Sequence, residues 1–201
     1  SAIASLLDYP RADFRQRLVD CRESLAGKME QSRSSPAGRS TPHAHQDCRR
    51  FPAQASAHLA DFDVATRGSQ PDELEELYTR TFDFNPSCAL EIGWHLFGED
   101  YHRGALLVRL RDELRRHSIQ ESCELPDHLI HVLPLVDCMN SRKAAEFSRA
   151  CVIPAVEKMV ANLEGKQNPY ESLLRCLAMM LHGEFGSEAC TADVSPDQEK
   201  A

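Results

Sequence analysis

The chain has 201 residues, of which 42% are hydrophobic and 27% are charged, and its formal net charge at pH 7 is −8. This length suits one domain, and the apolar content is near the globular norm, which argues against a fully disordered chain. The acidic excess argues against sequence-independent nucleic-acid binding, which needs lysine and arginine to neutralise phosphates, and favours a basic partner.

Membrane insertion and secretion are not expected. A membrane helix needs roughly 18 consecutive apolar residues, whereas the longest candidate, Cys176–Leu181, has six. The first residues have neither a basic flank nor a long apolar core, so they do not resemble a secretory signal. We therefore expect a cytoplasmic protein.

The eight cysteines contain no C-x-x-C pair. Zinc ribbons, iron–sulfur sites and thioredoxin-like centres need closely spaced thiolates, so no cofactor of these kinds is expected. In a reducing compartment the thiols are best interpreted as small apolar residues, several of them at core positions of helices.

Helical spacing of apolar residues begins soon after Pro10. Spacings of 4, 3 and 4 place one set on a single helical face: Phe14, Leu18, Cys21 and Leu25. Residues 31–47 lose this periodicity and are rich in serine and proline, which predicts a mobile loop. The helical pattern resumes at Phe51 and continues to Phe62.

The middle of the chain predicts three more helices. One starts at Pro71, with Ser69 as its N-cap, and stops near Asn85. A short helix then reaches Gly98, and a longer one spans residues 99–117, where acids at the start and bases at the end complement the helix dipole.

The last third also predicts helices. Residues 125–128 open one, whose apolar side is expected to comprise Leu125, Leu129, Val132, Leu133 and Val136. Ser141 is expected to cap the next helix, which Pro154 must kink or restart. A capping-box-like start at 168–171 opens the final helix, and the polar residues after Gly186, 186–201, are expected to be a disordered tail. Because no strand or hairpin signal occurs, we predict an all-α fold, a single compact multi-helix bundle.

Aromatic and acidic residues are concentrated between positions 73 and 104. We predict a groove with apolar walls and a negative edge, suited to a basic amphipathic peptide helix. The walls would be Tyr78, Phe82, Trp94 and Phe97, and the edge would be Glu76, Asp83, Glu91, Glu99 and Asp100. The alternative is that the aromatic residues are core and the acids form a solvated face.

Three clusters could instead carry metal or nucleophile chemistry: His43, His45 and Cys48; His95, Glu99 and His102; Cys123, His128 and His131. They define a second hypothesis, a metal-dependent helical enzyme or sensor. Solvated loop residues and helix caps are the structural alternatives. A third hypothesis, a nucleic-acid-binding regulator, would use Arg109, Arg111, Arg115 and Arg116, and the overall acidity disfavours it.

Four motifs in order resemble the TorD-like family of molybdoenzyme assembly chaperones, in its nitrate reductase delta-subunit (NarJ-like) branch. They are Leu6-Leu-Asp-Tyr-Pro10, Glu-Leu-Tyr-x-x-Thr-Phe-Asp within residues 73–84, Trp94-His-Leu-Phe-Gly-Glu-Asp-Tyr-x-Arg-Gly104, and Glu124-Leu-Pro-Asp-His-Leu129. Residues 84–94 are most similar to chaperones of exported type II DMSO-reductase-family enzymes. The loop at 31–47 and the cysteine content depart from the family pattern.

The resemblance implies an all-helical, non-catalytic, cytoplasmic chaperone. Such a protein binds the amino-terminal or twin-arginine signal region of a catalytic, molybdopterin-containing subunit, and holds the apo-enzyme for insertion of the molybdenum cofactor before assembly or export. Proteins of molybdenum cofactor biosynthesis are implied as further partners. The implied peptide-binding residues are Tyr78, Phe82, Asp83, Trp94, Glu99, Asp100 and Arg103. The implied ligand-handling residues are Pro126, Asp127 and His128.

Overall fold

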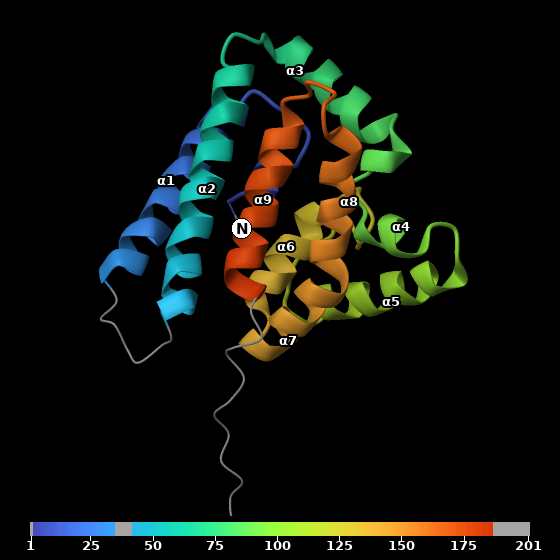
Figure 1. The fold of residues 1–201 in the computed structure, drawn as a ribbon. Helices are drawn as coiled ribbons and strands as arrows, with labels where there is room; N and C mark the ends of the chain where they lie inside the picture. The colour runs from blue at the N-terminus through green and yellow to red at the C-terminus, as the bar shows by residue number, and fades with distance from the viewer. Residues whose placement is uncertain (1, 35–41, 187–201) are drawn as a thin grey trace, which may run out of the picture.

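A computed structural model describes residues 2–34 and 42–186. Within these ranges the chain forms α-helices joined by turns, by 3-10 and π segments, and by an irregular segment at 117–128 (Figure 1). The α-helices are α1 Phe14–Ser34, α2 Pro42–Thr66, α3 Pro71–Tyr78, α4 Ile92–Phe97, α5 Tyr101–Arg116, α6 Leu129–Cys138, α7 Ser141–Phe147, α8 Ile153–Leu163 and α9 Tyr170–Phe185. The described residues contain no strand, so the all-α prediction is confirmed.

Helix α9 is the centre of the bundle. It packs against α2 on one side and α8 on the other, and α1 lies outside α2 (Figure 1). Its buried side is almost continuously apolar: Tyr170, Leu173, Leu174, Cys176, Leu177, Ala178, Leu181 and Phe185. Such a wide apolar face explains why this helix is enclosed by others.

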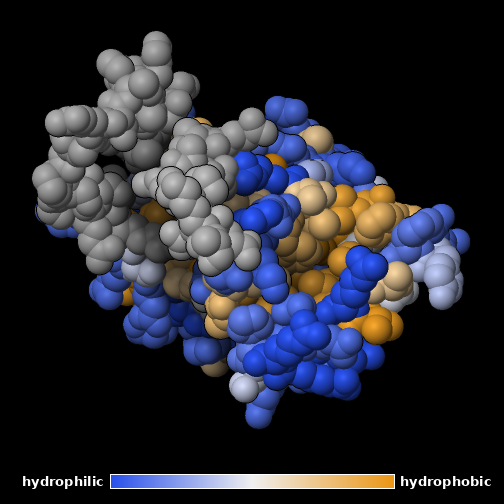
Figure 2. Space-filling view, turned by 90° about the horizontal axis from the view of Figure 1, so that it is seen from below, coloured by the Kyte–Doolittle hydropathy of each residue, from blue (hydrophilic) through white to orange (hydrophobic). Residues whose placement is uncertain are grey.

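Helices α4 and α5 form a hairpin at the opposite side from α1. Helix α5 buries only Leu110 and Leu114 fully, so most of its surface meets solvent. Figure 2 views the lower end of the molecule, where apolar residues lie exposed among hydrophilic ones. Val108 of α5 is one of the large apolar side chains that stay exposed.

Several sequence-based boundaries need correction. Helix α1 continues to Ser34 and α2 begins at Pro42, so the predicted loop at 31–47 is helical at both ends, and its centre, 35–41, lies outside the described residues. The tail prediction for 187–201 also falls outside them. No helix of the described part of the chain has the length and apolar character needed to cross a membrane.

Two predicted N-caps were wrong by one residue. Gln70, not Ser69, caps α3, in a capping box with Glu73. Asn140, not Ser141, caps α7, and its side-chain oxygen accepts a hydrogen bond from the backbone N–H of Lys143 at 3.0 Å. An amide is an effective N-cap because its oxygen satisfies a free N–H of the first turn.

The proline prediction was confirmed. Residues Ser148–Val152 form a π segment, η4, and α8 restarts at Ile153 with Pro154 in its first turn. Leu125, in contrast, was expected on the apolar side of the following helix but is exposed, because it lies four residues before α6 begins.

The cysteines largely follow the prediction. Cys21, Cys88 and Cys176 are buried, whereas Cys123 and Cys138 are exposed. Burial raises the pKa of Cys21 to about 11 and that of Cys176 to about 12, so both are neutral thiols at pH 7 and pack as apolar groups.

Candidate functional site

A cleft of about 410 Å³ opens where α3 ends and α4, α5 and the segment before α6 meet. Its lining residues are Phe82, Asp83, Pro86, Ala89, Leu90, Glu91, Trp94, Arg103, Glu124 and His128. The structure thus brings together six of the residues singled out from the sequence: Phe82, Asp83, Glu91, Trp94, Arg103 and His128. They come from separate segments of the chain.

A π segment, η2 (Thr79–Asp83), continues α3 and sets the upper edge of the cleft. Its wider turn is pinned by Thr81, whose hydroxyl donates to the carbonyl of Leu77 at 2.6 Å and accepts from the amide of Asn168 at 2.7 Å. Phe82 is directed into the core, Asp83 lines the cleft, and the following Phe84 is 82% exposed. Single π turns of this kind occur frequently at functional sites.

A short backbone pairing closes the floor of the cleft. Glu91 and His128 form an isolated antiparallel bridge. The N–H of Ile92 donates to the carbonyl of Asp127 at 2.9 Å, and the N–H of Leu129 donates to the carbonyl of Leu90 at 3.0 Å. This pairing joins the start of α4 to the start of α6 and brings the motifs at 90–104 and 124–129 to one place.

Asp127 and Arg103 form the buried polar contact of the site. The Asp127 side chain is 0% exposed, and its Oδ2 accepts a hydrogen bond from Nε of Arg103 at 3.3 Å. The Arg103 guanidinium lies over the Trp94 ring, with Cζ 5.6 Å from the ring centroid. Burial raises the pKa of Asp127, an effect that the charge of Arg103 opposes.

Gly93 makes this arrangement sterically feasible. An ideal Cβ at position 93 would lie 2.5 Å from Oδ2 of Asp127 and 3.3 Å from Cγ of Arg103. Any other residue would therefore push the carboxylate from its place. Gly93 was not among the predicted site residues, because nothing in its local sequence pattern indicates which side chains approach it.

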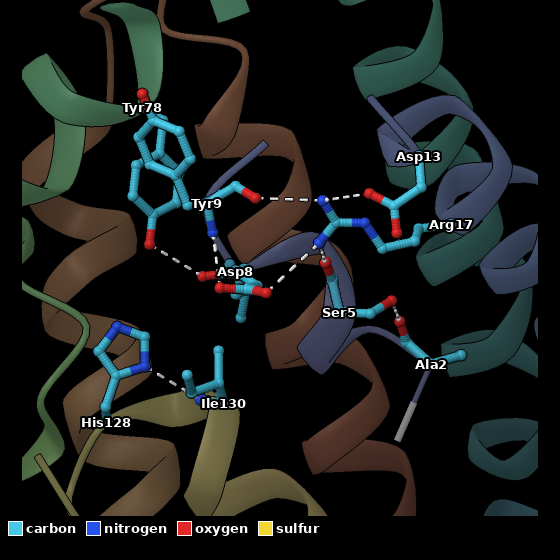
Figure 3. Close-up of polar contacts among 10 residues, drawn as sticks. Ala2, Ser5, Asp8, Tyr9, Asp13, Arg17, Tyr78, His128 and Ile130 are labelled. Atoms are coloured by element: carbon cyan, nitrogen blue, oxygen red, sulfur yellow. Dashed lines mark hydrogen bonds and ion pairs between the residues drawn. The ribbon is translucent and has the colours of Figure 1, made fainter. Parts of the chain in front are cut away.

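His128 acts as the N-cap of α6. Its Nδ1 accepts a hydrogen bond from the backbone N–H of Ile130 at 3.2 Å (Figure 3). Burial, with a smaller contribution from the neighbouring His131, lowers the pKa of His128 to about 4. The ring is therefore neutral at pH 7, which a hydrogen-bond acceptor at this position must be.

The cleft contains more acidic than basic groups. Glu91, Glu124 and Asp83 line it, with Arg103 as the only lysine or arginine among the lining residues. Burial raises the pKa of Glu91, and the charges of Asp127 and Glu124 raise it further. A cationic ligand would relieve this repulsion between carboxylates. Glu124 was missed as a site residue, although it begins one of the motifs quoted above.

Tyr78 is not a wall of the cleft. It is only 5% exposed, and its hydroxyl donates to the carbonyl of Leu7 at 3.1 Å (Figure 3). Its ring makes edge contacts with Tyr9, Phe82 and Tyr170 at centroid distances of 5.5, 5.1 and 6.0 Å. For Tyr78 the alternative interpretation, an aromatic core residue, is the correct one.

The motif at residues 6–10 is held in place by Arg17. Its guanidinium donates to the carbonyls of Ser5 and Tyr9, at 2.6 and 3.1 Å, and pairs with Asp8 and Asp13 at 3.7 and 3.2 Å (Figure 3). These contacts hold the amino-terminal segment against α1. That segment in turn supplies the carbonyl that Tyr78 needs.

The turn between α4 and α5 lies outside the cleft lining. Asp100 is the N-cap of α5 and accepts a hydrogen bond from the N–H of His102 at 2.8 Å. Glu99 is exposed, and Phe97 stacks on His102 instead of forming a cleft wall. Glu76 is likewise exposed and absent from the lining. The predicted negative edge is thus reduced to Asp83 and Glu91, with Glu124 added.

Pro126 and Asp127 are buried behind the cleft, and only His128 of the Pro-Asp-His motif reaches its lining. His131 is held by backbone groups: its Nδ1 lies 2.9 Å from the carbonyl of Leu125, and its Nε2 accepts from the N–H of Ser122 at 3.0 Å. Cys123 is exposed and contacts Glu124. These contacts leave no nucleophile–base pair among the three residues proposed for one.

Within the described part of the chain, no group of three His, Cys, Asp or Glu residues is placed to hold a metal ion. Gly98, with φ of 59°, separates His95 from His102, and Nε2 of His95 lies 2.6 Å from the carbonyl of Ala89. The side chains of His43, His45 and Cys48 lie outside the described part.

A second cavity, of about 320 Å³, lies between the amino-terminal segment, α1, α6 and α9. Its lining is mostly apolar and includes none of the residues that the sequence analysis assigned to a site: Ala2, Ile3, Cys21, Ser24, Leu25, Leu133, Val136, Asp137, Leu177, Met180, Leu181, Glu184 and Phe185. The cleft beside Trp94 therefore remains the candidate site.

Comparison with known proteins points to one family. A family model described as nitrate reductase delta subunit matches residues 48–171. The chain is 21% identical over 196 residues to the nitrate reductase molybdenum cofactor assembly chaperone NarJ of Escherichia coli strain K12, and equally to that of Escherichia coli O157:H7. Each alignment covers 97% of this chain and 74% of the relative. The matched residues include the whole cleft.

Proposed function

Because the chain belongs to the nitrate reductase delta subunit family, we propose that it is an assembly chaperone for the catalytic subunit of a molybdoenzyme. In this proposal it binds the amino-terminal or signal region of that subunit in the cytoplasm. It holds the apo-enzyme until the molybdenum cofactor is inserted, in concert with cofactor-biosynthesis proteins, and releases it for assembly or export. Family membership and the similarity to NarJ support the assembly role.

The observation that carries the proposal is the composition of the cleft. Signal regions place basic residues beside an apolar, helix-forming stretch. Asp83, Glu91 and Glu124 offer negative charge, while Pro86, Ala89 and Trp94 offer accessible apolar surface in the same depression. Complementary charge aligns the partner, and burial of apolar surface supplies affinity.

Phe84 extends the apolar surface at the edge of the cleft. It directly follows Asp83 and is 82% exposed, which is unusual for a phenylalanine in a free protein. Together with Pro86, which lines the cleft, it offers a contact for the apolar stretch of a bound peptide. Exposed aromatic side chains of this kind are frequent anchors of protein interfaces.

The same lining supports binding rather than catalysis. None of the residues that line the cleft is a serine, threonine or cysteine that His128 could activate. His128 itself already uses Nδ1 to cap α6. A chaperone needs only reversible binding of a polypeptide, for which this site has suitable chemistry.

The test is calorimetric titration of the chain with a synthetic leader peptide that places two arginines before an apolar, helix-forming stretch. We expect saturable binding with a Kd of about 1 μM, or about −8 kcal/mol. Asp83→Lys and Phe84→Ser should each weaken it at least about tenfold, since contacts at an interface centre are worth more than 1 kcal/mol.

Two matched variants serve as controls. Asp112→Lys makes the same charge change on the exposed side of α5, and Asp100→Asn keeps the helix cap outside the cleft. Both should bind as the native chain does. Absence of saturable binding, or equal losses in the Asp83 and Asp112 variants, would contradict the proposal.

A further inference from the structure

Arg103 is held in the cleft by few contacts. Of its guanidinium nitrogens, only Nε has a hydrogen-bond partner in the described chain, Oδ2 of Asp127, and that bond is long at 3.3 Å. The other contact is the stacking over Trp94. Arginine usually binds a carboxylate through two parallel N–H groups at 2.7–2.9 Å, so this pairing is geometrically incomplete.

The hydrogen bonding of the Asp127 carboxylate is also incomplete. Burial raises the pKa of this carboxylate and the nearby backbone N–H groups of Asp127 and Gly93 lower it, but its buried Oδ1 has no partner with hydrogen-bond geometry in the described structure. A buried carboxylate oxygen without a hydrogen-bond partner is rare in native structures. The carboxylate therefore has the capacity to accept another N–H, which a better placed donor could supply.

The surroundings favour a cation at this point. Burial raises the pKa of Glu91, and Asp127 and Glu124 lie close enough to Glu91 for their charges to raise it further. The one positive charge of Arg103 does not balance these carboxylates. A planar cation placed over Trp94 with two N–H groups on Asp127 would satisfy the free oxygen and keep the stacking interaction.

We propose that Trp94 and Asp127 form a guanidinium-binding subsite, which Arg103 fills in the free protein and from which an arginine side chain of the bound polypeptide displaces it. The subsite is a property of this chain, and only the source of the arginine rests on the proposed function. Arg103 is on the exposed helix α5 with its side chain 21% exposed, so the displaced group can turn into solvent. Lysine, which lacks the planar fork, should compete poorly.

Trp94 is the only tryptophan, so its fluorescence reports directly on this subsite. We would titrate N-acetyl-arginine amide and N-acetyl-lysine amide into the native chain and into Arg103→Gln. Glutamine keeps an N–H donor for Asp127 but removes the internal guanidinium. The expected result is arginine amide binding at least fivefold tighter in Arg103→Gln than in the native chain, and a clear preference for arginine over lysine amide in both.

Two further variants sharpen the test. Arg109→Gln removes an exposed arginine of the same helix and should leave the titration unchanged. Asp127→Asn, combined with Arg103→Gln, should abolish the response to arginine amide. If Arg103→Gln does not fold, the preference of the native chain for arginine over lysine amide still decides the question. A native chain without that preference would overturn the inference.

The affinity for the leader peptide gives an independent test. The Arg103→Gln substitution should change this affinity in opposite directions, depending on whether Arg103 is displaced by the peptide or contacts it. If Arg103 is displaced, Arg103→Gln binds the peptide more tightly; if Arg103 instead contacts the peptide, the variant binds it more weakly, and the inference is wrong. Failure of the peptide to bind any variant, while arginine amide binds as expected, would remove the proposed function and leave the subsite established.

Discussion

Gly93 is the residue on which the geometry of the site depends most directly. In Gly93→Ala the new Cβ would lie 2.5 Å from the Asp127 carboxylate, which must shift and lose its contact with Arg103. We expect the free energy of unfolding to fall by about 1–3 kcal/mol, as for other overpacked sites, measured by urea denaturation.

Gly104→Ala is the matched control, because a Cβ there meets nothing within 4 Å and the residue is inside α5. Alanine should stabilise that helix by up to about 1 kcal/mol. Opposite signs for the two glycine substitutions are the expected result. Equal effects would show that Gly93 is not sterically required.

The lowered pKa of His128 predicts that the stability of the fold depends on pH. Its pKa is about 4 in the folded chain, below the value of about 6.5 expected when unfolded, so the unfolded state binds the proton first as the pH falls. Protonation of His128 in the unfolded state does not affect stability above about pH 7. Between about pH 6.5 and pH 4 it lowers the free energy of unfolding progressively, by about 2 kcal/mol at pH 5.

His128→Asn isolates this effect, because asparagine also caps helices but does not titrate. Unfolding free energies at pH 7 and pH 5 should differ less in the variant than in the native chain, by about 2 kcal/mol. Parallel pH profiles would mean that protonation of His128 does not couple to folding.

The sequence placed individual aromatic residues on a helical face but could not decide what covers that face. Tyr78 and Phe82 are four residues apart, as predicted for one side of a helix. An aromatic residue belongs to the core when other segments pack over it, and to a groove when they do not. Tyr78 is packed against Leu7 and Tyr170, which are remote in the sequence. Local spacing carries no information about such partners.

At the scale of elements, the amino-terminal segment depends on Arg17. Arg17→Met would remove two charged hydrogen bonds to the carbonyls of Ser5 and Tyr9, while keeping much of the aliphatic side chain. We expect a loss of about 3–6 kcal/mol in the free energy of unfolding, because two hydrogen bonds to a charged group are removed and each contributes about 1.5–3 kcal/mol.

Arg22→Met is the comparison for this prediction. Arg22 also belongs to α1 and pairs with Asp63 at 2.7 Å, but its side chain is 52% exposed. Exposed ion pairs contribute about 0–1 kcal/mol, so this variant should stay close to the native stability. A similar loss in both variants would argue that Arg17 is not a specific clamp.

Helix order and approximate helix positions could be predicted from apolar spacing, caps and prolines. The π segments η2 and η4 could not, since each inserts an extra residue in a turn without interrupting the apolar pattern. For η2 the cause is partly tertiary: Asn168, 87 residues away, bonds Thr81. The exact orientation of Phe82 and Asp83 therefore needed the structure.

At the scale of the whole molecule, the lining of the cleft was predicted only in part: Asp83, Trp94 and Arg103 were expected there, whereas Glu124 was not. Its residues come from motifs that the sequence placed in the right order, and the Glu91–His128 bridge joins two of them. The exclusion of Glu99 and Asp100 follows from Gly98, whose positive φ turns the chain away between α4 and α5. That turn is a backbone property which a charge pattern cannot reveal.

The net charge of −8 predicts how a basic leader peptide associates with the chain. Long-range attraction speeds encounter, and salt screens it as the Debye length falls from about 10 Å at 0.1 M to about 3 Å at 1 M. Over this range we expect the association rate constant to fall about tenfold and the dissociation rate constant to change much less, as measured by stopped-flow fluorescence of Trp94.

Charge reversals separate this general field from the contacts in the cleft. Asp83→Lys and Asp112→Lys each change the net charge from −8 to −6, so both should slow association slightly and to a similar degree. Only Asp83 lines the cleft, so only its reversal should speed dissociation, by about tenfold if the contact is worth about 1.4 kcal/mol. Association that does not respond to salt, or dissociation that responds equally to both reversals, would show that the acidic cleft does not recognise the leader by charge.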